Sequence, residues 1–95
     1  MKNGLAIAGL ALLAGCKAKA TSAQCDELLD RYAQLVVLER YPDASVGQIE
    51  AERARERGEA RGDDAFKNCS SEVSRAELEC AMKAGKAEGV LKCLE

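Results

Sequence analysis

The five cysteines constrain this chain more than any other feature of its sequence. They occur within 95 residues that include one Phe, two Tyr, no Trp and no His. So many cysteines in a short chain indicate an oxidising compartment, where cysteines pair as disulfides. A chain this short with few large apolar side chains has a marginal core, and each disulfide typically adds about 2–4 kcal/mol of stability. We therefore expect one small domain that depends on its disulfides.

Composition also excludes several classes of function. The 14 basic and 16 acidic residues give a formal charge of −2, which argues against a nucleic-acid-binding protein. Without His, neither Ser-His-Asp nor Cys-His catalysis is available, and no metal site can contain His. The carboxylate pairs Asp26/Asp30 and Asp63/Asp64 lack the apolar surroundings that would perturb a pKa. We expect a protein that is not an enzyme, with no catalytic residue, metal, cofactor or small-molecule substrate.

The amino-terminal segment has the pattern of an export signal. Met1-Lys2-Asn3 carries one positive side chain, and residues 4–14 form an uninterrupted run of apolar residues and glycines. As a helix, these 11 residues would extend about 16 Å, roughly half of a bilayer's hydrocarbon core of about 30 Å. The run is too short for a membrane span and fits the apolar region of a secretory signal peptide.

The residues that end this run are Leu13, Ala14, Gly15 and Cys16. They resemble the lipobox of bacterial lipoproteins, which consists of Leu, two small residues and Cys. The resemblance implies that Cys16 receives a diacylglyceryl group, that cleavage follows Gly15, and that the new amino group then takes an acyl chain such as palmitate. Two or more acyl chains form a stable membrane anchor, at about 0.8 kcal/mol per buried methylene. In this family Asp after the cysteine favours inner-membrane retention, so Lys17 implies the outer membrane of the cell envelope.

An ordinary signal peptidase site offers an alternative. Ala18-Lys19-Ala20 is an A-x-A pattern, and cleavage after Ala20 would release a secreted soluble protein. Lys17 and Lys19 place charges where such a site prefers small neutral residues, which favours the lipobox. The predicted organisation is a signal peptide at 1–15, the lipidated cysteine with a short tether at 16–21, and a helical domain at 22–95.

Capping patterns predict that the domain is all-α. Thr21 with Gln24 forms a capping box, followed by apolar residues at helical spacing up to Tyr41, where Pro42 ends the helix. Further capping boxes open at Ser45 and Ser74, and a last short helix is expected at 87–94. The prediction is a small disulfide-stapled antiparallel bundle of three to four helices.

The helix after Ser45 is highly charged, with Glu and Arg alternating at helical spacing. Pairs such as Glu50–Arg53 and Glu52–Arg55 predict a solvated face. Four small residues form a stripe on its other side: Gly47, Ala51, Ala54 and Gly58. We expect the large side chains of the first helix to pack against this stripe.

The four cysteines that follow Cys16 can pair in three ways: Cys25, Cys69, Cys80 and Cys93. We favour Cys25–Cys69 with Cys80–Cys93, because each bond would join the two helices of one hairpin. A metal site or redox pair is the alternative if the thiols are reduced. Against it, the four include no C-x-x-C spacing.

A possible partner surface lies late in the first helix. Val37, Leu38 and Tyr41 point away from the apolar stripe, so either the last helix covers them or they form an exposed patch for an envelope protein. The preferred hypothesis is a membrane-anchored lipoprotein that serves as a structural or protein-interaction module. The alternatives are a secreted helical effector or inhibitor, and a metal- or redox-active cysteine protein. The part after the lipobox also resembles small Cys-containing helical lipoproteins of Gram-negative bacteria, which implies no activity.

Overall fold

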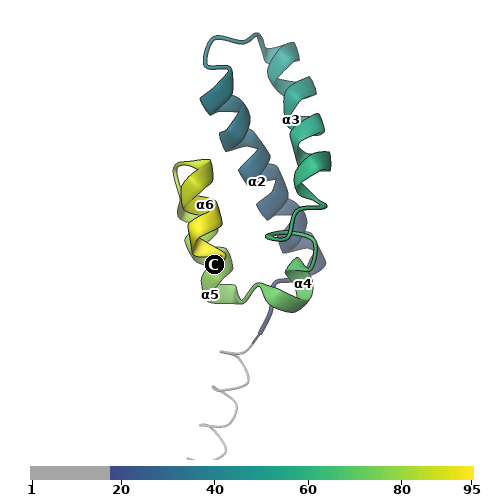
Figure 1. Cartoon of the computed structure of the whole chain (residues 1–95), viewed down its shortest axis with the longest axis vertical. Coiled ribbons are helices and arrows are strands. Elements are labelled where there is room, and N and C mark those ends of the chain that lie inside the picture. Colours follow the sequence, from purple (N-terminus) through teal and green to yellow (C-terminus); the bar gives the residue numbers. More distant parts are fainter. Residues whose placement is uncertain (1–17) are drawn as a thin grey trace, which may run out of the picture.

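The computed structural model describes residues 18–95, and the predicted signal peptide and lipobox lie outside them. The described part contains five α-helices and no strand longer than an isolated bridge: α2 (Ser22–Arg40), α3 (Val46–Ala60), α4 (Cys69–Glu72), α5 (Arg75–Lys83) and α6 (Ala87–Cys93). Figure 1 shows a long hairpin of α2 and α3, and a short hairpin of α5 and α6 on the other side of α2. The predicted all-α, disulfide-stapled bundle is confirmed.

Helix α2 is the central element, because each of the other four helices packs against it. Its first turn has the predicted capping box, in which the Thr21 N–H donates to Gln24 Oε1 at 2.9 Å and the Gln24 N–H donates to Thr21 Oγ1 at 3.1 Å. The helix ends at Arg40, and the Tyr41 N–H donates to the Val37 carbonyl at 2.8 Å just before Pro42. Local sequence therefore sets both ends of this helix.

The hydrophobic core lies mainly between α2 and the segment that contains α4, α5 and α6. Its buried members include Leu28 and Leu35 from α2, Phe66 from the loop before α4, and Leu78 and Val90 from the short hairpin. Leu28 and Val90 are among the largest side chains that are fully buried. The short hairpin thus supplies the apolar side chains that α3 lacks.

The small-residue stripe of α3 is not its packing face, so that prediction is wrong. All four stripe residues are exposed, and a Cβ added at Gly47 or Gly58 would meet nothing within 4 Å. The opposite side of α3 faces α2, with Glu56 and Ala60 buried. Long Arg and Glu stems cover more apolar surface than Ala and Gly, and their charged ends find partners on α2.

Ion pairs connect α3 to α2 along this interface. On α2, Asp30 Oδ1 lies 3.2 Å from Arg57 Nη1 and 3.6 Å from Arg53 Nε. Arg40 Nη1, also on α2, lies 3.1 Å from Oε1 of the buried Glu56. Asp26 also pairs with a cation, Arg61, at 3.8 Å. The two carboxylates considered as an acid/base pair, Asp26 and Asp30, therefore have structural partners.

Two disulfides join the elements in the connectivity that the sequence analysis favours. Cys25–Cys69 links the start of α2 to α4 with a Cα–Cα distance of 6.0 Å. Cys80–Cys93 links α5 to α6 with a Cα–Cα distance of 5.6 Å. Each bond therefore fixes the position of one short helix relative to its neighbour.

Candidate functional site

The start of the described chain pairs with the segment between α4 and α5. The Ala20 N–H donates to the Val73 carbonyl at 2.9 Å, and the Arg75 N–H donates to the Ala18 carbonyl at 3.3 Å, with Lys19 opposite Ser74. We call this pairing of residues 18–20 with 73–75 the terminal bridge. Ala20 is only 3% exposed and belongs to the core. Residues 18–20, which the sequence assigns to a tether at 16–21, are therefore part of the folded domain.

No local sequence pattern indicates this bridge. A three-residue backbone pairing between segments more than 50 residues apart leaves no periodicity, and Ala20 resembles any small residue near a cleavage site. Cys16 itself lies outside the described residues. In sequence, only Lys17 separates it from the bridge.

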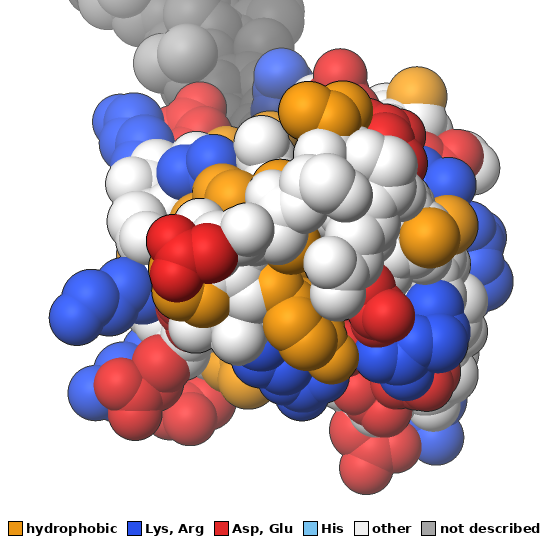
Figure 2. Space-filling view, turned by 90° about the horizontal axis from the view of Figure 1, so that it is seen from above, with side chains coloured by type: hydrophobic (Ala, Val, Ile, Leu, Met, Phe, Trp, Pro, Cys, Tyr) orange, Lys and Arg blue, Asp and Glu red, His pale blue; other side chains and the backbone are white. Residues whose placement is uncertain are grey.

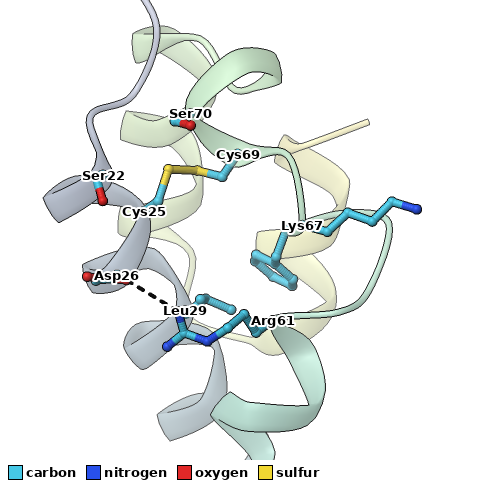
Figure 3. Close-up of a pocket in the computed structure, with 9 residues that line it drawn as sticks. Ser22, Cys25, Asp26, Leu29, Arg61, Lys67, Cys69 and Ser70 are labelled. Carbon is cyan, nitrogen blue, oxygen red and sulfur yellow. Dashed lines mark ion pairs between the residues drawn. A yellow bond between two sulfur atoms is a disulfide. The ribbon is translucent and has the colours of Figure 1, made fainter.

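A shallow pocket of about 160 Å³ lies beside the Cys25–Cys69 disulfide, where the first turn of α2 meets α4 and the loop before it. Figure 3 shows the disulfide in its wall, Arg61 reaching toward Asp26, and Lys67 pointing away. Lys67 pairs with Asp64 at 2.9 Å. The remaining lining residues of the pocket are Ser22, Leu29, Phe66 and Ser70. In this pocket the two cysteines are bonded to each other, and Arg61 and Lys67 are paired with carboxylates.

Tyr32 packs against Phe66 near this pocket, with ring centroids 4.9 Å apart. Burial raises the pKa of the Tyr32 phenol above its ordinary value of 10.0, and the charges of Glu56 and Asp63 raise this pKa further, against a smaller opposing effect of Arg40. The phenolate is the form that is disfavoured in the folded state.

We expect the domain to lose stability at alkaline pH through Tyr32. Below pH 10 the phenol is protonated in both states; above it the unfolded chain loses the proton first, so stability falls as the pH rises through the folded-state pKa. Absorbance at 295 nm would follow Tyr32 alone in the Tyr41→Phe variant, since the chain has two tyrosines. The midpoint should be higher in the folded protein than in denaturant; equal midpoints would contradict this expectation.

The predicted partner patch is only partly present. Val37 is 2% exposed, which agrees with the covered alternative and removes this residue from an exposed patch. Tyr41 is half-buried, while Leu38 is 44% exposed, and Val46, which the sequence analysis missed, is 78% exposed. Val46 is the first residue of α3, where no preceding turn can cover it. Figure 2 shows this end of the molecule, where hydrophobic side chains are separated by charged and polar ones.

Two charged residues of α2 cap the turn between α5 and α6. Arg31 Nη2 donates to the Ala84 carbonyl at the end of α5 at 2.9 Å, and Glu39 accepts the Ala87 N–H at the start of α6 at 2.9 Å. A cation at a helix C-terminus and an anion at an N-terminus both complement the helix dipole. Because Lys86 provides no side-chain cap for α6, Glu39 supplies it from another helix.

Within residues 18–95, no group of three or more His, Cys, Asp or Glu side chains could hold a metal ion. Over the same range, no helix is long and apolar enough to cross a membrane. Comparison of the chain with protein-family models, with curated proteins and with solved structures gave no match.

Proposed function

We propose that this chain is a lipid-anchored lipoprotein of the bacterial cell envelope, held at the outer membrane by acyl chains on Cys16. Its helical domain serves as a non-catalytic structural or protein-interaction module. The observation that carries the proposal is the terminal bridge, which makes residues 18–20 part of the domain.

Cleavage at one of the two candidate sites keeps the terminal bridge, and cleavage at the other removes it. Cleavage before Cys16 leaves residues 18–20 in place, so the mature domain keeps Ala20 in its core and both bridging hydrogen bonds. Cleavage after Ala20 would remove all of these contacts and would leave the Val73 carbonyl without its donor. The loss of Ala20 would also expose the core surface that this residue covers. The contacts of residues 18–20 therefore support cleavage at the lipobox site.

The bonding of the cysteines and aspartates favours a module without catalysis. The four cysteines after Cys16 are all in disulfides, and Asp26 and Asp30 are paired with arginines of α3 or its C-terminal end. Among residues 18–95, Leu38 and Val46 near the α2–α3 turn are the exposed large apolar side chains, and they are available to a protein partner.

Replacing Cys16 with Ser tests the anchor directly. We expect the unaltered protein in the membrane fraction, with an intact mass that begins at Cys16 and includes acyl chains. Reduction should add about four hydrogens, since two disulfides are present. Cys16→Ser should carry no lipid mass, whereas the neighbouring control Lys17→Ser should keep it. A native mass that begins at Thr21 without lipid would contradict the anchor and support the secreted alternative.

A further inference from the structure

We propose that the end of the domain that carries the terminal bridge lies directly against lipid headgroups, so that the anchored domain stands in one orientation. This inference rests on the proposed lipid anchor at Cys16. It adds that the bilayer surface is itself a contact partner of the folded domain, at a surface formed around Lys19, Ser74 and Arg75.

The first step is a distance that the covalent chain imposes. Two peptide units separate Cys16 from Ala18, and consecutive Cα atoms are about 3.8 Å apart, so the two Cα atoms lie within about 7.6 Å of each other. This is less than the diameter of one helix, about 10–12 Å. An acyl chain that begins at Cys16 therefore keeps this end of the domain close to the bilayer surface.

The second step is that Ala18 is fixed relative to the helices. Its carbonyl accepts the Arg75 N–H, and two residues later the buried Ala20 bonds to Val73. The preceding helix, α4, is joined covalently to α2 through Cys25–Cys69. Because the bridge is tied to the core in both ways, only Lys17 separates the fixed part of the domain from the anchored residue.

The third step is the chemistry of this surface. Lys19 and Arg75 are exposed, and neither forms an ion pair with any described residue. Of the acidic groups close to Arg75 in sequence, Glu77 accepts the Ser74 N–H at 2.9 Å and Glu72 accepts from Asn68 at 3.5 Å, while the exposed Glu79 lies one helical turn after Arg75. Two unpaired cations beside the anchor suit the phosphates of lipid headgroups.

This orientation determines what faces away from the membrane. Helix α2 begins at Ser22, shortly after the bridge pair Lys19–Ser74, and runs for 19 residues, about 28 Å, to the α2–α3 turn. Figure 1 shows that turn at the opposite end of the domain from residues 18–20. Leu38 and Val46 are therefore held at a fixed height above the lipid surface.

Tryptophan quenching can test the orientation, because the chain contains no Trp of its own. Ala76→Trp, beside Arg75, reports on the bridge end, and its matched control Val46→Trp reports on the opposite end; both positions are exposed. Each full-length lipidated variant would be placed in vesicles of phosphatidylethanolamine and phosphatidylglycerol that contain lipid brominated near the headgroup. We expect the emission of the Ala76→Trp variant to be quenched several-fold more strongly than that of the Val46→Trp variant.

The outcomes separate this inference from the proposed function. Equal quenching of the two variants, or stronger quenching at position 46, would overturn the fixed orientation while the acylated mass and flotation with vesicles still supported the anchor. If the two full-length variants carried no acyl mass and did not float with vesicles, the proposed anchor itself would be overturned. Inserting a Gly/Ser linker of about ten residues between Lys17 and Ala18 of each variant keeps the anchor, and the difference between positions 76 and 46 should then disappear.

Discussion

Removal of the Cys25–Cys69 disulfide is expected to lower the unfolding free energy by about 4 kcal/mol, against about 3 kcal/mol for Cys80–Cys93. The two bonds close loops of different length, with sequence separations of 44 and 13 residues. A longer loop in the unfolded chain loses more conformational freedom when its ends are joined. Because a small domain has only a few kcal/mol of stability, loss of the first bond should leave the chain largely unfolded at 37 °C.

The burial of the cysteines also predicts that loss of Cys25–Cys69 costs more stability than loss of Cys80–Cys93. Cys69 is a buried member of the core, so its substitution also leaves a space there, whereas Cys80 is exposed on α5. The exposed bond should be reduced first when a mild reductant is added, since access to the sulfur atoms limits thiol exchange.

Paired substitutions would measure this order. The variants Cys25→Ala/Cys69→Ala and Cys80→Ala/Cys93→Ala would be unfolded in urea in the same detergent as the full-length protein, with circular dichroism at 222 nm. The second pair is the matched control, because it removes the same number of sulfur atoms. A larger loss of stability from the second pair would contradict the loop-length argument.

The helix starts could be predicted from sequence because capping depends on residues within one turn. At Thr21 and Ser74 both halves of the predicted capping box form. At Ser45 only one half does: its hydroxyl accepts the Gln48 N–H at 3.2 Å, but no reciprocal bond from Gln48 accompanies it. The favoured disulfide pairs also follow from an antiparallel order of helices.

The orientation of α3 could not be predicted, because both of its faces are plausible when the helix is considered alone. Small residues allow close approach, but long charged side chains pack their stems and use their charges. The face of α3 that packs against α2 is determined by Asp30 and Arg40 of α2, which pair with Arg57 and Glu56. The terminal bridge could not be predicted either, and neither could the caps that α2 provides for α5 and α6. Each of them depends on contacts between segments that are distant in sequence.

Two leucines of α2 should respond very differently to the same substitution. Leu28 is 0% exposed within the core, so Leu28→Ala removes packed methyl groups and should cost about 2–5 kcal/mol of unfolding free energy. Leu38 is 44% exposed, and Leu38→Ala should change this free energy by no more than about 0.5 kcal/mol.

Comparing Leu28→Ala with Leu38→Ala separates the effect of burial from the other effects of replacing Leu with Ala. Both residues lie inside the same helix, Ser22–Arg40, so the difference in helix propensity between Leu and Ala applies equally to each. Urea unfolding of the two variants under the same conditions would measure the difference. Equal losses would mean that Leu38 is covered in the folded protein, and the apolar surface near the α2–α3 turn would then no longer be available to a partner. A large loss for Leu28 alone would leave Leu38 as a position where contact with a partner can be altered while the fold is kept.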